Sequence, residues 1–416
     1  MSCARASAAL EPWAWQRAAA LLVPPPEPVA ANPFQAWDAT ALLQALEASS
    51  AADAPSPDPG LVLAVLSRAW SEPDRALLRQ GADRLRQRLV GDSVSYVFNR
   101  NLNVSNHCVQ HCSFCAFRRD PGDPGAYWLS LDELQRRAAA AQAAGATELC
   151  LQGGLNAAAT VEGSQLAYAE QLLHALVQAA PGIHLHAFSP QELLFFAEQD
   201  GISLQLVIER LQRAGLGSVP GTAAEVLSEP LRQRLCPEKL SARAWVAVIL
   251  QVHAAGLPST STLMAGHIES PADRAAHLLS LRAVQAEARA RGLAGFSEFV
   301  LLPFVGEAAP AVLRRQVGRD QPDLAAMLQL TALARLVLGA AIANHQPSWV
   351  KLGLAGAAEA LHWGCNDLGG TLMEEHITTM AGARGGTAQS PEALVAAAHR
   401  QGRPAYQRTT LYGRLP

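Results

Sequence analysis

The sequence predicts an α/β protein, a (β/α)8 barrel of the TIM type with a small helical extension at its N-terminus. From Val94 onward, strand-like and helix-like patterns alternate, which is typical of parallel strands joined by helices. The chain has 416 residues, half of them hydrophobic, so it can bury a barrel-sized core and carry an appendage. Polar and glycine-rich segments directly follow the strand candidates, at the mouth where barrel enzymes keep their active sites.

The first 93 residues predict the N-terminal extension. Residues 1–60 are rich in Ala and Pro, with a short helix at 39–46 and a linker at 51–60. Residues 61–93 have helical apolar spacing and predict a helical cap, which is clearest at 74–89. We expect no signal peptide, because the apolar run before Pro24 is short and interrupted. We also expect no membrane span, because no apolar stretch is long enough to cross a bilayer.

The barrel itself is predicted over residues 94–380. Its eight strand candidates are short runs with strand-like composition, at 96–103, 147–152, 183–188, 218–221, 259–264, 298–303, 349–352 and 367–371. Helix starts are marked by N-cap signals at Ser130, Ser189, Ser270 and Ser390. The last signal predicts that residues 381–416 form a C-terminal helix and tail that pack on the barrel.

The charge of the chain bears on its partners. The formal net charge is −3 and the isoelectric point is near 6.5. Nucleic acids and anionic lipids select strongly basic surfaces, so this balance favours small-molecule substrates and predicts no nucleic-acid partner and no membrane partner.

Three of the seven cysteines, Cys108, Cys112 and Cys115, lie within eight residues, just after the first strand candidate. A closed structural zinc site uses four protein ligands and a redox disulfide uses two, so three clustered thiols favour a centre with one open position. The alternatives are buried thiols without a metal, or a zinc site completed by His107 or His111. The odd count and the tight cluster argue against a disulfide framework and predict a reducing, cytoplasmic location.

Other polar groups are expected at the same mouth. Gln152, Gly153 and Gly154 follow the second strand candidate, and Glu225 and Glu269 follow the fourth and fifth. Glycines let the backbone approach a ligand, and carboxylates accept hydrogen bonds from amines or ribose hydroxyls. A simple loop turn and carboxylates that cap or pair at helix starts are the alternatives.

Histidines, a lysine and three further cysteines also need an interpretation. His184 and His186 alternate along the third strand candidate, so they share a face, either as hydrogen-bonded core residues or as catalytic groups. Lys351 lies on the seventh strand candidate, and its side chain is expected at the mouth. The widely spaced cysteines are interpreted as small core residues: Cys150, Cys236 and Cys365.

The spacing C-x3-C-x2-C with Phe114 before the third cysteine resembles the signature of the radical S-adenosylmethionine enzymes. Longer motifs from Val94 to Tyr412 resemble one branch of that superfamily, the tyrosine-adding component of FO synthase. They lie at 99–103, 116–119, 148–154, 184–190, 220–225, 236–237, 266–269, 298–304, 348–353, 366–375 and 407–412. The first sixty residues depart from that family and carry no functional inference.

The resemblance implies the cofactors. In the superfamily, three thiolates in the positions of Cys108, Cys112 and Cys115 hold three irons of a [4Fe-4S] cluster. The fourth iron binds the amino and carboxylate groups of S-adenosylmethionine, and an external one-electron donor drives cleavage to a 5′-deoxyadenosyl radical. The same resemblance places the loop at 152–154 against the methionine amino group, and the two mouth glutamates beside S-adenosylmethionine or substrate. It assigns no catalytic side chain.

The resemblance also implies a reaction. The 4-hydroxybenzyl group of L-tyrosine is joined to C5 of 5-amino-6-(D-ribitylamino)uracil, which gives 5-amino-5-(4-hydroxybenzyl)-6-(D-ribitylimino)-5,6-dihydrouracil on the route to the deazaflavin FO. The ring-closing component of FO synthase would then be a functional partner. The alternatives are the aminofutalosine synthase of menaquinone biosynthesis, the ring-closing component itself, and a non-catalytic zinc-stabilised barrel that binds a nucleoside.

Overall fold

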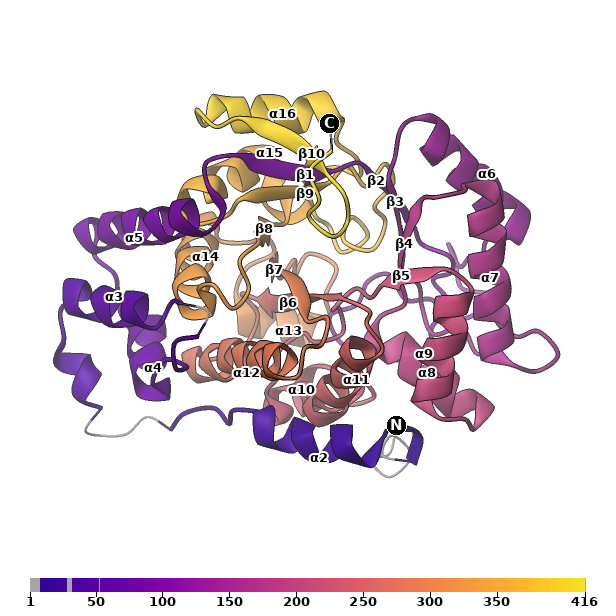
Figure 1. The fold of residues 1–416 in the computed structure, drawn as a ribbon, viewed down its shortest axis with the longest axis horizontal. Helices are drawn as coiled ribbons and strands as arrows, with labels where there is room; N and C mark the ends of the chain where they lie inside the picture. Colours follow the sequence, from indigo (N-terminus) through magenta and orange to yellow (C-terminus); the bar gives the residue numbers. More distant parts are fainter. Residues whose placement is uncertain (1–7, 28–31, 52, 416) are drawn as a thin grey trace.

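The computed structural model describes residues 8–27, 32–51 and 53–415; Cys3, parts of the predicted N-terminal extension and the last residue of the predicted tail lie outside the described residues. The described strands form a ring with helices around it (Figure 1). The strands are β1 (Val94–Val97), β2 (Asn99–Leu102), β3 (Glu148–Leu151), β4 (His184–Ala187), β5 (Leu216–Ser218), β6 (Ser259–Ala265), β7 (Phe296–Pro303), β8 (His345–Pro347), β9 (Asp367–Gly370) and β10 (Ala405–Arg408).

The strands pair in parallel and close on themselves. Three hydrogen-bonded sheets have the orders β10-β1-β9, β2-β3-β4-β5 and β6-β7-β8. A parallel bridge between Val219 and Ser259 joins β5 to β6, and the amide of Asn366 donates to the carbonyl of His345 at 3.1 Å beside β8 and β9. Because β1 continues into β2 across Phe98, the sheets form one ring. The predicted (β/α)8 barrel is confirmed.

Helices cover the outside of this ring. Four of them begin at the predicted starts, where the side chains of Ser130, Ser189, Ser270 and Ser390 all accept the expected N-cap hydrogen bonds. The helices are α2 (Pro12–Leu21), α3 (Ala39–Ala48), α4 (Pro59–Ser67), α5 (Glu72–Val90), α6 (Leu131–Ala143), α7 (Gln165–Ala179), α8 (Pro190–Asp200), α9 (Leu204–Arg213), α10 (Glu229–Leu235), α11 (Ala242–Ala254), α12 (Pro271–Ala290), α13 (Ala311–Val317), α14 (Leu324–Leu338), α15 (Trp349–Glu359) and α16 (Pro391–Arg400), with short 3-10 helices at Pro33–Ala36 and Ala360–Trp363.

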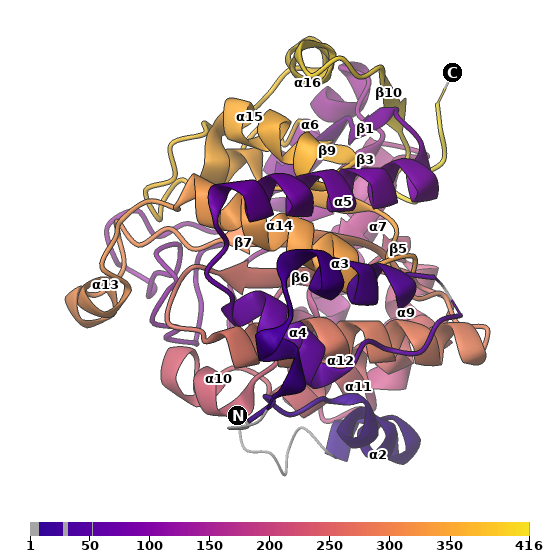
Figure 2. The same ribbon diagram turned by 90° about the vertical axis from the view of Figure 1, so that its left-hand side faces the viewer.

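The N-terminal helices pack on the barrel helices. Helix α2 contacts α11, α4 contacts α12, and α5 contacts α14. Figure 2 shows α3, α4 and α5 together on one side of the molecule. The guanidinium groups of Arg243 and Arg291 lie 4.1 Å and 4.3 Å from the ring centroids of Trp15 and Trp13. Stacking of this kind fixes an Ala-rich helix that has few large side chains of its own.

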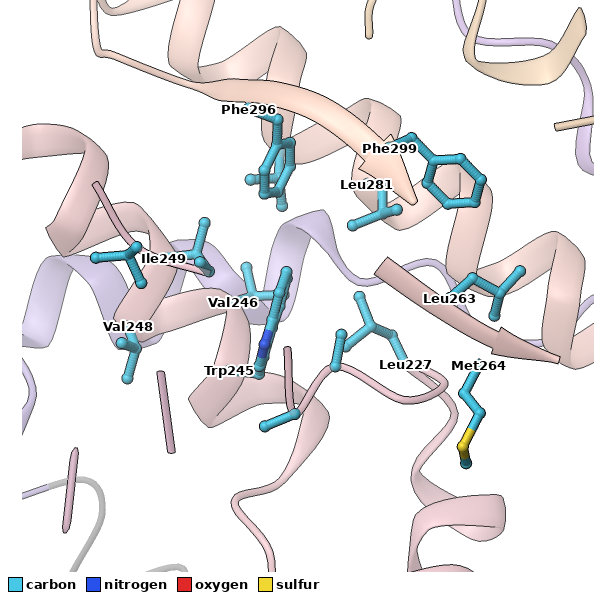
Figure 3. Packing of buried hydrophobic residues seen from close by; sticks show 14 of the residues in the cluster. Leu227, Trp245, Val246, Val248, Ile249, Leu263, Met264, Leu281, Phe296 and Phe299 are labelled. Carbon is cyan, nitrogen blue, oxygen red and sulfur yellow. The ribbon is translucent and has the colours of Figure 1, made fainter. Parts of the chain in front are cut away.

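The core between the helices and the ring is best seen where α11, β6 and β7 meet (Figure 3). Every residue of β6 is buried, as expected for a parallel strand that is covered on its outer face and faces the barrel interior on the other. The rings of Trp245 on α11 and Phe296 on β7 stack with centroids 6.2 Å apart. Among the described residues, no helix combines the length and the apolar character needed to cross a membrane.

The seventh predicted strand is wrong. Residues 349–352 begin helix α15, and the strand is β8, which ends at Pro347. Trp349 and Val350 have strand propensity, but both are buried in the first turn of the helix, so packing explains their apolar character. Proline has no amide hydrogen to extend the ladder, which ends β8 early. Lys351 therefore lies in the first turn of α15, just past the end of β8.

Two other strands differ from the predictions. The fourth, expected at 218–221, is β5 at Leu216–Ser218, and the segment after it passes close to β6: a Cβ on Gly221 would lie 1.9 Å from the carbonyl oxygen of Thr260. The predicted tail contains an additional strand, β10, which pairs with β1 from Val94 opposite Ala405 to Val97 opposite Arg408. The end of the chain thus becomes part of the sheet structure around the site.

Candidate active site

A cavity of about 410 Å³ lies inside the ring and opens toward the carboxyl ends of the strands. All three clustered cysteines line it, together with Gln152, Gly153, Gly154 and Glu225. Its lining also includes polar side chains that the sequence analysis did not assign to the site: Asn99, Glu148, Glu192, Lys239, Glu298 and Arg408.

The cysteine loop is held from both sides. The amide of Val109 donates to the carbonyl of Leu155 at 3.1 Å, which attaches the loop to the segment after β3. The amide and hydroxyl of Ser113 both donate to the carbonyl of Leu235 at the end of α10, at 3.0 and 2.8 Å. These bonds hold the cysteine loop at the cavity through backbone atoms and the Ser113 hydroxyl, and none of them uses a cysteine thiol.

The donor set fits a cluster better than a single ion. Within the part of the chain that the structure describes, no three His, Cys, Asp or Glu side chains converge closely enough to hold one metal ion. Both ring nitrogens of His111 have partners, Glu238 at 3.2 Å and Arg118 at 2.7 Å, so His111 does not complete a zinc site. Three thiols that border one cavity without a common centre suit a [4Fe-4S] cluster, in which each cysteine binds a different iron.

The surroundings of the thiols are partly apolar. Burial raises the pKa of Cys112 to about 12, although the nearby ammonium of Lys239 opposes this. Lys239 lies 5.3 Å from the ring centroid of Phe114 and forms an ion pair with Glu225 at 2.6 Å. The Cys112 thiol therefore carries a proton near neutral pH and releases it when a metal binds. Glu225 thus lines the cavity, and its ion pair with Lys239 places it near the cysteine loop.

The glycine loop after β3 contacts the cysteine loop directly. The amide of Gly154 donates to the carbonyl of Ser105 at 2.8 Å. A Cβ on Gly154 would lie 2.2 Å from the carbonyl oxygen of His107 and 2.9 Å from the Cβ of Cys108. No side chain fits there, so glycine at this position lets the two loops touch.

We therefore expect Gly154→Ala to displace the cysteine loop. The clash is with backbone atoms, so it is relieved only if the loop around Cys108 moves. After anaerobic reconstitution, the variant should retain well under half of the iron and sulfide of the wild-type protein. Gly153→Ala is the matched control, because its Cβ would meet the carbonyl oxygen of Ser105 at 3.3 Å, which a small shift accommodates. Equal iron content in the two variants would contradict this account.

Glu192 lies in the first turn of α8, three residues after the predicted helix start at Ser189, and it supports the glycine loop. Its carboxylate accepts hydrogen bonds from the amide and hydroxyl of Ser189, at 2.7 and 2.6 Å, and from the amide of Gly153. Burial raises the pKa of Glu192 to about 7 despite these donors. The capping motif could be recognised in the sequence. The contact between Glu192 and Gly153 could not, because it depends on the order of the strands in the ring.

Glu269 differs from the other predicted site residues, because it is not among the described residues that line the cavity. Its carboxylate accepts hydrogen bonds from the amides of Gly266 and His267, at 2.7 and 2.9 Å, and pairs with Arg274 at 2.6 Å. These contacts shape the loop after β6. The structure therefore gives Glu269 a local role at the start of α12, which was the alternative interpretation.

The histidines of β4 share one hydroxyl. A ring nitrogen of His184 and one of His186 each lie 2.7 Å from the hydroxyl oxygen of Ser218 on β5, which confirms that both point to the same face. His186 lines the cavity, and burial lowers its pKa to about 4, so it is neutral at pH 7. Cys150 also lines the cavity and is not an ordinary core residue. By contrast, Cys236 and Cys365 are buried in the core as expected.

The cavity floor is a polar network built partly from β10. Arg408 pairs with Asp367 at 2.5 Å and with Glu298 at 3.3 Å, and the hydroxyl of Tyr412 donates to Glu298. Burial raises the pKa of Glu298 to about 7, while the Arg408 guanidinium opposes this. Across the floor, Glu148 accepts a hydrogen bond from Asn99 at 2.7 Å. The floor therefore offers both donors and acceptors to a polar ligand.

Comparisons with known proteins agree with this geometry. Residues 102–281 match the radical SAM superfamily, and residues 293–412 match the family described as the CofH/MqnC C-terminal region. The chain is similar to 5-amino-6-(D-ribitylamino)uracil–L-tyrosine 4-hydroxyphenyl transferases. Identity is 58% to that of Synechococcus elongatus, over 84% of this chain and 90% of the relative. Identity is 52% to that of Thermosynechococcus vestitus, over 92% of this chain and 94% of the relative.

Solved structures support the fold. The FeFe-hydrogenase maturase HydG from Carboxydothermus hydrogenoformans superposes with a TM-score of 0.67 at 16% identity, over 96% of this chain and 84% of HydG. Methylornithine synthase (PylB) superposes with a TM-score of 0.65 at 14% identity, over 88% of this chain and 97% of PylB. The chain therefore belongs to the radical SAM superfamily and, within it, to the family of 5-amino-6-(D-ribitylamino)uracil–L-tyrosine 4-hydroxyphenyl transferases.

Proposed function

We propose that this chain joins the 4-hydroxybenzyl group of L-tyrosine to C5 of 5-amino-6-(D-ribitylamino)uracil in the biosynthesis of FO. The observation that carries the proposal is the identity of 52–59% to transferases of that name, which spans both the cysteine loop and the C-terminal region. The cavity supports it, because it combines three thiols with a polar floor and is large enough for small polar substrates.

The cysteine loop and the walls of the cavity have different roles in the proposed reaction. Cys108, Cys112 and Cys115 line the cavity and would hold three irons of a [4Fe-4S] cluster, and the glycine loop that ends at Gly154 lies against the cysteine loop. When bound, the cluster supplies the electron that cleaves S-adenosylmethionine and so provides the hydrogen-abstracting radical. The ring walls exclude water and stray hydrogen donors from this chemistry.

The floor suits the uracil substrate. Ribityl hydroxyls and uracil N–H and C=O groups need both donors and acceptors, which Asn99, Glu148, Glu298 and Arg408 provide. The Cα–Cβ bond of tyrosine breaks and the benzyl carbon bonds to C5, after which the C6 imine forms by loss of the proton of the exocyclic amine and of one electron, which balances the electron that starts the reaction. Glu298 lies in the cavity, and its pKa near 7 suits a group that accepts a proton near neutral pH.

We also propose an electron donor, a partner enzyme and a cellular location. An external one-electron donor must reduce the cluster, because the reaction starts with reductive cleavage. The product is the expected substrate of a ring-closing FO synthase component. We propose a cytoplasmic location, because three thiols that must stay reduced require a reducing compartment.

Two parallel reactions test the function. Protein reconstituted anaerobically with iron and sulfide, and supplied with reductant and S-adenosylmethionine, should convert tyrosine plus 5-amino-6-(D-ribitylamino)uracil to the hydroxybenzyl adduct. It should not act comparably on 3-[(1-carboxyvinyl)oxy]benzoate, the aminofutalosine-branch substrate. A site built for an ammonium, a carboxylate and hydroxyls leaves buried polar groups unpaired with the wrong ligand, which can discriminate by roughly 10⁴-fold.

Mass spectrometry of both mixtures measures the adduct, the aminofutalosine-type product and 5′-deoxyadenosine. Turnover of the benzoate without any adduct from tyrosine would reject the proposal in favour of the aminofutalosine synthase. Omission of S-adenosylmethionine is the control, and it should abolish the hydroxybenzyl adduct and 5′-deoxyadenosine.

A further inference from the structure

The cations that line the cavity differ in whether they have a partner. Lys239 pairs with Glu225 at 2.6 Å, and Arg118 pairs with Asp120 at 2.5 Å. Arg408 is held by the floor carboxylates of β7 and β9. Each of these charges is already balanced by the protein, so none is free to bind an anionic ligand without breaking an ion pair.

Lys351 is the exception. Its side chain lines the cavity from the first turn of α15, and among the described residues it forms no side-chain hydrogen bond or ion pair. The two carboxylates that act on its charge, Glu375 and Glu225, are already engaged. Glu375 accepts from the amides of Thr378 and Thr379, at 2.8 and 3.2 Å, and Glu225 is paired with Lys239.

An enclosed ammonium without a partner is unfavourable in the empty protein. Burial lowers the pKa of Lys351, and Glu375 and Glu225 oppose this shift only in part. The lost hydration is recovered when a ligand brings an anionic group to the ammonium. The position of Lys351 on the cavity therefore defines a subsite for an anion.

The proposed reaction has two ligands that carry an anionic group of the right size. Both L-tyrosine and S-adenosylmethionine have an α-carboxylate, whereas 5-amino-6-(D-ribitylamino)uracil has none. The cysteine loop follows β2 and the glycine loop follows β3. In the ring order, β9 and the continuous strand β1-β2 separate β8, which precedes Lys351, from β3. Lys351 thus enters the cavity two positions along the ring from the strand before the cysteine loop and three positions from the strand before the glycine loop.

We propose that Lys351 binds the α-carboxylate of the amino-acid substrate and so fixes tyrosine in the cavity. This inference rests on the proposed function, and it adds the residue that selects an α-amino acid. A ligand with the same phenol and amine but without the carboxylate gains nothing from this lysine.

Binding of L-tyrosine and of tyramine, which lacks the carboxylate, tests the inference. The titrations use anaerobically reconstituted protein with S-adenosylmethionine and without reductant, so that no turnover occurs. Lys351→Met should weaken tyrosine binding by roughly 30-fold or more, as expected when one partner of an enclosed charge pair is removed. Tyramine binding should change by less than about 3-fold, and Lys351→Arg should restore part of the tyrosine affinity.

Three other results would overturn the inference. Equal weakening of tyrosine binding and tyramine binding would show that Lys351 has a structural role. Lys351→Gln, with the same iron content as the wild type, is a second uncharged variant for this comparison. Weakened binding of S-adenosylmethionine with unchanged tyrosine affinity would assign the lysine to the methionyl carboxylate. Unchanged affinity for tyrosine in Lys351→Met would leave the lysine without this role.

The wild-type reaction with tyrosine is measured first, because it separates the two proposals. Absence of adduct from the wild-type protein would overturn the proposed function and this inference with it. Adduct formation by the wild-type protein together with normal tyrosine binding by Lys351→Met would overturn the inference alone.

Discussion

Replacement of Cys112 by alanine is expected to abolish the cleavage of S-adenosylmethionine. Of the described cysteines that line the cavity, only Cys108, Cys112 and Cys115 share one loop, so loss of one leaves two protein ligands for a centre that needs three. Reconstituted wild-type protein should bind about four irons per chain with matching sulfide, and the variant should bind much less. Iron and sulfide analysis and the yield of 5′-deoxyadenosine, measured by mass spectrometry, give the two readouts.

Cys365→Ala is the matched control for this variant. Cys365 is buried in the cluster of apolar residues around α15 and α16, away from the cavity lining, so its loss should cost about 1 kcal/mol of stability and no iron. Cys150 does not serve as a control, because it lines the cavity. Normal cleavage of S-adenosylmethionine by Cys112→Ala would rule out the cluster assignment.

The cysteine loop could be predicted because its chemistry is local. Three thiols within one short loop must lie near one another in any fold, so spacing alone places them together. The helix starts were local too, since a serine side chain caps the amide three residues later in the same segment. The alternation of these helices with strands was then enough to predict the barrel.

Other features depend on packing between distant segments. Trp349 and Val350 resemble a strand by composition, but they begin helix α15, and their burial there accounts for their apolar character. The strand at Ala405–Arg408 has an ordinary polar sequence, and it pairs with β1 because the ring offers an edge there. Glu192 and Glu269 both lie near helix starts, yet of these two only Glu192 lines the cavity in the folded barrel.

The charged floor was equally hidden from the sequence. Glu298, Asp367 and Arg408 are separated by tens of residues, and nothing in their spacing predicts an ion-pair network. Their motifs supported a family resemblance without revealing what the side chains do. The structure shows that the C-terminal strand carries the arginine that balances the carboxylates of β7 and β9.

Replacement of Arg408 by methionine should therefore destabilise the barrel strongly. Asp367 and Glu298 are both buried and would lose their cationic partner, which typically costs about 3–5 kcal/mol of unfolding free energy. Urea unfolding of anaerobic protein measures the change through the midpoint. Arg414→Met is the control on the same tail: the backbone of Arg414 bridges Arg408 and is kept in the variant, while its exposed guanidinium lies 4.7 Å from the ring centroid of Tyr406, so the loss of this side chain should cost less than about 1 kcal/mol.

The cost of Arg408→Met should also rise with pH. Burial raises the folded pKa of Glu298 to about 7, above its unfolded value, so its ionisation destabilises the folded state as the pH rises through 7. In the wild-type protein Arg408 limits this loss, because its charge favours the ionised carboxylate. Without Arg408 the folded pKa of Glu298 moves higher, and the variant loses more stability between pH 6 and pH 8 than the wild type does. Equal pH dependence of the two proteins would show that Arg408 does not control the charge of the floor.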